Sequence, residues 1–380
     1  MKISDQAQTI TPFLVMDVME RANTKAEQGT QIIHLEVGEP DFDTPRCVRD
    51  AALKAMEEGK THYTDSRGIP ELRDAICKHY RDTYHVEVER DQVLVTGGSS
   101  PGLLIAVACL ATVSDEILMT DPYYACYPNF VRVVGATPSL IPTGSDDGFQ
   151  LDPAKARKAI RPCTKAMLIN SPANPTGVCL DESHLIELSS LGLPIISDEI
   201  YHGLVYEAQQ HTILEYTDNA IVINGFSKAY AMTGWRLGWA IFPKSLIRTA
   251  QKIQQNLMIC APSIAQWGGI AALTQAHDDV AHMYNTFSRR RKIMLEAMAG
   301  HGFTVETEPT GAFYVLVNMK DISSDSYRLA LDILENTGVG VTPGIDFGPG
   351  AASYIRFSYA NSEENIREGV RKVAGYLKSL

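Results

Sequence analysis

The chain has 380 residues, of which 45% are apolar and 21% are charged, values typical of folded proteins that exclude the disordered and fibrous classes. A chain of this length favours two domains or one large domain. The formal net charge of -11 argues against binding to nucleic acid or anionic lipid, because both partners select a basic surface.

The N-terminal sequence MKISDQAQTITPF lacks the charged start and apolar run of a signal peptide. No window of the chain resembles a membrane span, so we expect a cytoplasmic protein. The seven cysteines are an odd number, lie far apart and form no C-x-x-C pair, and the ten histidines show no H-E-x-x-H spacing. We therefore expect neither a disulfide framework nor a metal site.

From about residue 90 to residue 240, short apolar segments alternate with amphipathic stretches, as strands joined by helical crossovers do. Several of these segments are apolar throughout, which is typical of strands covered on both faces. The expected strands are residues 93–96, 116–120, 137–142, 165–170, 194–198, 220–226 and 238–242. The sequence therefore predicts a large α/β domain with a mostly parallel sheet flanked by helices.

Apolar residues recur with a helical period over residues 244–300, and the remaining chain has alternating strands at 311–317 and 353–360, mixed with helices. This pattern is typical of a smaller α+β domain. No Gly/Ser linker separates the two parts, so we expect a continuous helix around residues 280–300 to join them. The expected division is an N-terminal segment 1–45 that packs with the small domain, a large domain 46–285 and a small domain 286–380.

Ligands of an open α/β sheet gather beyond the carboxyl ends of its strands. GGSSPG follows the strand at 93–96, and it places Ser99 and Ser100 before an apolar helix whose free N–H groups and positive end suit an anion. An ordinary capped turn has the same pattern.

Two further strand ends carry candidate binding groups. DPYYACY follows the second strand and contains Tyr123, Tyr124 and Tyr127, which could stack on a flat ligand or pack in the core. SPANPTG follows the strand at 165–170, where two prolines fix the backbone and Asn174 offers a side-chain amide. A plain turn is the alternative for this segment.

The most informative strand ends are those of SDEIY and NGFSKAYAMTGWRLGW. Asp198 ends a buried strand, where a carboxylate is costly unless a cation or donors meet it, and Tyr201 lies near the same edge. Capping of a turn is the alternative role for Asp198. Lys228 follows another apolar strand, with Ser227 beside it and Arg236 beyond. Burial and nearby cations would lower the pKa of this lysine and suit it to a Schiff base, and a surface lysine is the alternative.

One ligand requires all of these groups together: an anion site, a stacking ring, an acid for a ring nitrogen, a phenol and an amide for a ring hydroxyl, and an amine for an aldehyde. Pyridoxal phosphate has these features. The chain also resembles the class I aminotransferases, which are fold type I pyridoxal phosphate enzymes, from VGEPDFDTP at 37–45 to IRFSYA at 355–360. The resembling motifs are Y-T at 63–64, GGSS, NPTG, SDEIY and GFSKAYAMTGWRLGW.

The resemblance implies the fold type I architecture and a role for each matched residue. Lys228 resembles the lysine that forms an aldimine with pyridoxal phosphate, and Asp198 resembles the partner of its ring nitrogen. Tyr124 resembles the ring that stacks on the cofactor. Asn174 and Tyr201 resemble the groups that hydrogen-bond the ring oxygen.

The remaining matched residues concern the phosphate, the substrate and a second subunit. The residues that resemble the phosphate site are Ser99, Ser100, Ser227 and Arg236. Tyr63 resembles the residue that reaches the phosphate of the neighbouring subunit, which implies a homodimer. Arg356 resembles the clamp for the substrate's α-carboxylate, supported by Gly38 and Asn174, and a planar guanidinium suits that task.

The implied function is transfer of an amino group from an L-amino acid to a 2-oxo acid by a ping-pong exchange. A lyase that performs β-elimination on the same fold is the alternative, and a non-catalytic ligand-sensing regulator is a third. Family members with acidic substrates often have a lysine where this chain has Ser100, which favours small, apolar or aromatic donors, with 2-oxoglutarate or pyruvate as acceptor. Residues 11–19 would cover the substrate entrance or pack against the small domain. The resemblance also implies a cis peptide bond before Pro175.

Overall fold

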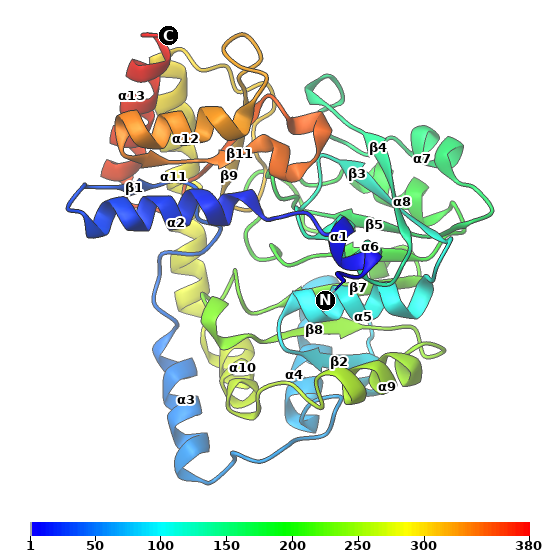
Figure 1. The fold of residues 1–380 in the computed structure, drawn as a ribbon. Helices are drawn as coiled ribbons and strands as arrows, with labels where there is room; N and C mark the ends of the chain where they lie inside the picture. The colour runs from blue at the N-terminus through cyan, green and yellow to red at the C-terminus, as the bar shows by residue number, and fades with distance from the viewer. Residues whose placement is uncertain (1) are drawn as a thin grey trace.

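A seven-stranded sheet is the largest feature of the computed structural model, which describes residues 2–380 (Figure 1). The strands are β2 (Val93–Thr96), β3 (Glu116–Asp121), β4 (Thr137–Pro142), β5 (Thr164–Asn170), β6 (Ile195–Asp198), β7 (Ala220–Gly225) and β8 (Gly238–Ile241). Their order is β2-β8-β7-β6-β5-β3-β4, and only β8 runs antiparallel to its neighbours. The bounds agree with the expected ones to within one residue, so the predicted mostly parallel sheet is confirmed.

Helices cover both faces of this sheet. They are α3 (Arg46–Glu57), α4 (Pro70–Tyr84), α5 (Ser99–Leu110), α6 (Tyr127–Val133), α7 (Pro153–Ala159), α8 (Glu182–Ser189), α9 (Ile247–Leu257) and α10 (Ser263–Gln275). Along β2, Val93 and Val95 belong to one core with α4 and α10, whereas Leu94 belongs to a second core with α5. Because alternate side chains enter different cores, these strands show no apolar alternation.

The second part of the molecule combines the two ends of the chain. Its strands are β1 (Ile33–His34), β9 (Tyr314–Asn318), β10 (Val339–Gly340), β11 (Thr342–Pro343) and β12 (Tyr354–Ser358). Strand β12 lies between β11 and β9 in an antiparallel sheet, and β1 pairs in parallel with β10. Helices α2 (Leu14–Glu27), α12 (Ser326–Thr337) and α13 (Glu363–Leu377) pack on these strands, and Figure 1 shows the blue α2 beside the orange α12.

The core of this second part includes residues that lie far apart in the sequence. Val18 and Ala22 of α2 share it with Phe313 and Val315. Helix α11 (His277–His301) continues without a break, as expected for residues 280–300. From the two separate groups of strands we propose the division into an N-terminal segment 1–45, a large domain 46–285 and a small domain 286–380.

Three further observations concern residues 2–380. None of their helices combines the length and the apolar composition that a membrane crossing requires. All seven cysteines are free thiols. No group of three potential metal ligands comes together in this part of the chain.

Candidate active site

A hollow of about 380 Å³ lies beyond the carboxyl ends of β5, β6 and β7, where the seven-stranded sheet faces residues of β12 and α2. The predicted site residues that line it are Gly38, Ser99, Ser100, Tyr124, Asn174, Asp198, Tyr201, Ser227, Lys228, Arg236 and Arg356. Tyr63 is the predicted residue that does not line it, and it is 80% exposed on the loop between α3 and α4. Groups from both domains therefore meet in one place.

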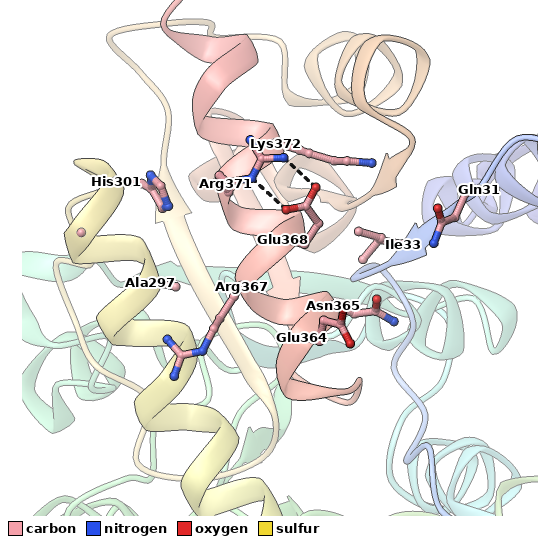
Figure 2. A pocket seen from close by; sticks show the side chains of 11 residues that line it. Gln31, Ile33, Ala297, His301, Glu364, Asn365, Arg367, Glu368, Arg371 and Lys372 are labelled. Atoms are coloured by element: carbon pink, nitrogen blue, oxygen red, sulfur yellow. Dashed lines mark hydrogen bonds and ion pairs between the residues drawn. The ribbon is translucent and has the colours of Figure 1, made fainter.

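A second hollow, of about 520 Å³, lies in the small domain between α11 and α13, and Figure 2 shows its side chains. Some of its charged groups pair with one another, as Arg371 does with Glu368 at 2.7 Å. Within residues 2–380, none of its side chains is a buried polar group without a partner. No predicted site residue lines it, so the hollow at the strand ends is the candidate active site.

Lys228 points its amine into the hollow. The Nζ atom donates a hydrogen bond to the carbonyl oxygen of Gly38 at 2.5 Å. Burial lowers the pKa of this lysine to about 8; Glu39 opposes the shift, and the guanidinium groups of Arg356 and Arg236 add to it. A buried lysine with such a pKa is partly neutral near pH 8, and the neutral amine is the nucleophilic form.

Asp198 is a buried carboxylate at the end of β6, 3% exposed. Burial raises its pKa to about 6, and hydrogen bonds from the Tyr127 hydroxyl and the Ile200 N–H oppose that shift. Within residues 2–380 it forms no ion pair, and Lys228 acts on it only from beyond ion-pair distance. A buried carboxylate that forms no ion pair with the described residues fits the protonated ring nitrogen of pyridoxal phosphate.

Two of the three tyrosines that follow β3 line the hollow, namely Tyr124 and Tyr127. Their rings meet edge to face, with the ring centroids 5.3 Å apart. The sequence offered Tyr127 only as a stacking ring or as core. The structure shows that its hydroxyl contacts Asp198 at 2.7 Å. Nothing in the local sequence indicated this contact, because the two residues lie on different elements.

Asn170 is a second residue that the sequence reasoning missed. Its side-chain nitrogen donates to the carbonyl oxygen of Asp198 at 2.8 Å, and its side-chain oxygen accepts from the N–H of Asn174 at 2.8 Å. Asn170 and Asp198 are partners in the parallel ladder of β5 and β6. A polar residue that ends an apolar strand was the available signal.

The peptide bond before Pro175 is cis, which confirms the prediction of a cis bond at this position.

Arg356 lies in the middle of β12 and is 3% exposed. Its guanidinium donates to Asn174 Oδ1 at 2.7 Å, to the Glu36 carbonyl oxygen at 2.8 Å and to Thr342 Oγ1 at 3.0 Å. The guanidinium also lies over the ring of Tyr314, 4.2 Å from its centroid. These contacts hold the planar fork in one orientation at the hollow, where it can bind a carboxylate.

The hydroxyl groups of Tyr201 and Tyr314 lie 2.9 Å apart, one from each domain. Burial raises the pKa of both phenols, so both remain protonated and can donate hydrogen bonds. The sequence indicated Tyr314 only as part of the alternating strand at 311–317. In the structure its hydroxyl contacts that of Tyr201, and the face of its ring contacts the guanidinium of Arg356.

The N-terminus of α5 has groups that suit an anion. The helix begins at Ser99 after Gly98, whose φ is 104°. A Cβ atom at Gly98 would lie 2.6 Å from Nη2 of Arg236, so glycine leaves the room that this guanidinium occupies. The N–H groups of the first helical turn have no acceptor within the helix. Together with the hydroxyl groups of Ser100 and Ser227 they suit a phosphate.

The segment after α1 (Asp5–Thr9) lines part of the hollow, and Val18 of α2 also lies in the core of the second part of the molecule. The carboxylate of Asp346 accepts hydrogen bonds from the N–H groups of Leu14 and Val15, each at 2.8 Å. The apolar side chains that line the hollow from this segment are Phe13, Val15, Met16 and Met19. The segment therefore packs as one expectation for residues 11–19 has it, and cover of the substrate entrance stays a prediction.

Comparisons with known proteins find relatives over nearly the whole chain. The model of the family described as aminotransferase class I and II matches residues 30–373. A (5-formylfuran-3-yl)methyl phosphate transaminase from Methanocaldococcus jannaschii is 42% identical over 96% of each chain. The structure of a single mutant of Thermus thermophilus aspartate aminotransferase has a TM-score of 0.94 at 36% identity and covers 99% of each chain. A Methanococcus jannaschii structure, described as similar in its active site to kynurenine aminotransferases, has a TM-score of 0.91 at 40% identity and covers 99% of this chain and 100% of its own.

Proposed function

The chain belongs to the class I and II aminotransferases, which depend on pyridoxal phosphate, and from this premise we propose that Lys228 is the residue that binds the cofactor covalently. The observation that carries the proposal is one hollow that holds the Lys228 amine, the buried Asp198 carboxylate and the Arg356 guanidinium. The relatives are named aminotransferases, which does not favour the lyase alternative.

Bound pyridoxal phosphate supplies an aldehyde that takes up an amino group and a ring that accepts electrons from the substrate's Cα. In our proposal, Nζ of Lys228 removes the Cα proton, because its lowered pKa makes the neutral amine available near neutral pH. The Asp198 carboxylate holds a proton on the ring nitrogen, and Arg356 binds the α-carboxylate. Donor and acceptor use this site in turn.

The other predicted residues would hold the cofactor and the substrate in place. Tyr124 would stack on the ring, and Asn174 and Tyr201 would hydrogen-bond its oxygen. The residues proposed to hold the phosphate are Ser99, Ser100, Ser227 and Arg236. Gly38 and Asn174 would support the bound α-carboxylate. All of these residues line the hollow, which supports the proposal.

We further propose a homodimer in which Tyr63 reaches the phosphate site of the neighbouring subunit. Its 80% exposed ring on the loop before α4 supports this role, because a large exposed aromatic side chain is a common anchor in interfaces. A cytoplasmic location also remains a prediction.

For the amino donor we propose an L-amino acid with an apolar or aromatic side chain. Phe13 and apolar side chains of α2 line the hollow. The lysines and arginines that line it within residues 2–380 are Lys228, Arg236 and Arg356, and each already has a proposed role. A side-chain carboxylate would therefore find no further cation among the described residues that line the hollow, and burying an unpaired charge is costly.

The test is a comparison of kcat/KM for phenylalanine, valine and aspartate, with 2-oxoglutarate, pyruvate and (5-formylfuran-3-yl)methyl phosphate as acceptors. We expect the apolar and aromatic donors to exceed aspartate by roughly tenfold or more, the scale on which a pocket discriminates by such contacts. Ser100→Lys should shift this ratio toward aspartate, since it adds a cation. Lys228→Ala is the control and should show no turnover. A wild-type preference for aspartate would contradict the proposed donor, and transamination by Lys228→Ala would contradict the proposed site.

A further inference from the structure

Tyr127 is the only side chain of residues 2–380 that donates a hydrogen bond to the Asp198 carboxylate. Its hydroxyl lies 2.7 Å from Oδ2, and the other donor is the backbone N–H of Ile200, 3.2 Å from Oδ1. Each carboxylate oxygen therefore has one donor from the protein. An ionised carboxylate accepts about four hydrogen bonds, so capacity remains for a further partner in the hollow.

The position of the Tyr127 ring is set by packing. Tyr127 is the first residue of α6 and is 2% exposed. It belongs to the core that also contains Leu168 of β5 and Ile223 of β7, and its ring meets that of Tyr124 edge to face. Because this core encloses the ring, the hydroxyl cannot turn away from Asp198 without disturbing the packing.

The direction of the hydrogen bond is also determined. Burial and the nearby Asp198 carboxylate raise the pKa of Tyr127 well above its ordinary value, so the phenol keeps its proton and acts as the donor. In turn, the Tyr127 hydroxyl opposes the effect of burial on the pKa of Asp198 more strongly than any other group does. The other titratable groups that act on this carboxylate or are acted on by it are Lys228, Tyr124 and Glu199.

We propose that Tyr127 is a positioning residue that fixes both the orientation and the negative charge of the Asp198 carboxylate, so that Asp198 can hold the proton of the cofactor's ring nitrogen. This inference rests on the proposed role of Asp198 and extends it to a residue on α6. Tyr127 acts through Asp198. Its removal should therefore change the protonation of the ring nitrogen, which a role limited to packing would not do.

The experiment replaces Tyr127 with phenylalanine, which keeps the ring and removes the donor. The holoenzyme is loaded with pyridoxal phosphate labelled with nitrogen-15 in its ring, and the chemical shift of that nitrogen is followed against pH. A hydrogen bond to a charged group corresponds to roughly one to two pH units of proton affinity. We expect the pH at which the ring nitrogen loses its proton to fall by about that amount in Tyr127→Phe.

Tyr80→Phe is the matched control. Tyr80 is a fully buried tyrosine of the large domain whose hydroxyl accepts a hydrogen bond from Trp239 Nε1 and does not contact Asp198. We expect this variant to titrate like the wild type.

A second variant carries fluorotyrosine at position 127, which keeps the shape of the side chain and donates a stronger hydrogen bond, so the titration of the ring nitrogen should move to higher pH.

Asp198→Asn separates this inference from the proposed function. If Asp198→Asn removes the ring proton and Tyr127→Phe leaves its titration unchanged, the role of Tyr127 is wrong and the role of Asp198 stands. If Asp198→Asn has no effect, the proposed role of Asp198 is itself wrong. In the double variant, Tyr127→Phe should add nothing to Asp198→Asn, because its effect passes through that carboxylate.

Discussion

Glu199 follows Asp198 in the chain but does not line the hollow. One of its carboxylate oxygens accepts hydrogen bonds from the Ser197 hydroxyl, the Thr212 hydroxyl and the Ile213 N–H, each at 3.0 Å. Within residues 2–380 the other oxygen, Oε2, has no hydrogen-bond partner, and Nδ1 of His202 lies 3.5 Å from it. Burial raises the pKa of Glu199 to about 8, so adjacent carboxyl groups of the chain differ in ionisation near neutral pH.

This raised pKa predicts a dependence of stability on pH. Between the ordinary value for glutamate and about 8, the folded protein binds more protons at Glu199 than the unfolded chain does. The contribution of Glu199 to the free energy of unfolding is therefore fully present below the ordinary pKa of glutamate, and it is lost as the pH rises through about 8. Asp198 acts in the same direction over a lower range, which ends near pH 6.

Glu199→Gln should weaken this dependence, because glutamine keeps the accepting oxygen and does not titrate. Between pH 5 and pH 8, we expect the wild type to lose about 2–5 kcal/mol more unfolding free energy than the variant does, since one unit of pKa shift corresponds to about 1.4 kcal/mol. Urea unfolding at equal protein concentration measures the unfolding free energy of the wild type and of the variant at each pH. An identical pH dependence in the two proteins would show that Glu199 is ionised in the fold.

At the scale of the elements, the turn between β2 and α5 shapes the proposed phosphate site. Gly98 has a backbone conformation that side chains of L-residues rarely adopt, and it leaves room for the Arg236 guanidinium. The helix that follows directs its first N–H groups to the same place. The turn thereby brings three kinds of anion donor together: N–H groups, hydroxyl groups and a guanidinium.

Gly98→Ala should weaken cofactor binding. The new Cβ would displace the Arg236 side chain, and alanine would be strained at this φ, a cost of order 1–3 kcal/mol that corresponds to a roughly tenfold or larger rise in the dissociation constant for pyridoxal phosphate. This dissociation constant is measured by titrating the apoprotein with pyridoxal phosphate and monitoring the absorbance of the cofactor. Gly144→Ala is the control, because nothing lies within 4 Å of a Cβ there. Equal affinities in both variants would exclude this role for Gly98.

For the whole molecule, the open question is whether one chain completes its own site. Lys228 lines the hollow of its own chain, whereas Tyr63 does not. In the proposed homodimer, each site would combine Lys228 of one subunit with Tyr63 of the other. The two residues can therefore be tested on separate chains.

Mixing the Lys228→Ala and Tyr63→Ala proteins under conditions that exchange subunits should restore activity. Each mixed dimer would contain one site with both residues intact, and random exchange would restore about a quarter of the wild-type sites. The measurement is transamination before and after exchange, with each variant alone as the control. If no activity above the Tyr63→Ala level returns, Tyr63 does not act across the subunit interface.

The sequence by itself determined the strands of the large sheet, the long helix α11 and the positions of most candidate residues. Strand bounds follow from local apolar patterning, and the chain placed its polar groups directly after those strands. Because parallel strands end at one edge of a sheet, Asn174, Asp198 and Lys228 had to come close together whatever the detailed packing.

Only the tertiary structure decided which groups contact one another. The hydrogen bonds of Arg356 to Asn174 and Glu36, and that of Tyr127 to Asp198, join residues that are distant in the chain. Such contacts depend on the packing of whole elements, and no local pattern encodes that packing. The pKa values of Lys228 and Asp198 likewise follow from burial, because the cost of a charge depends on everything that surrounds it.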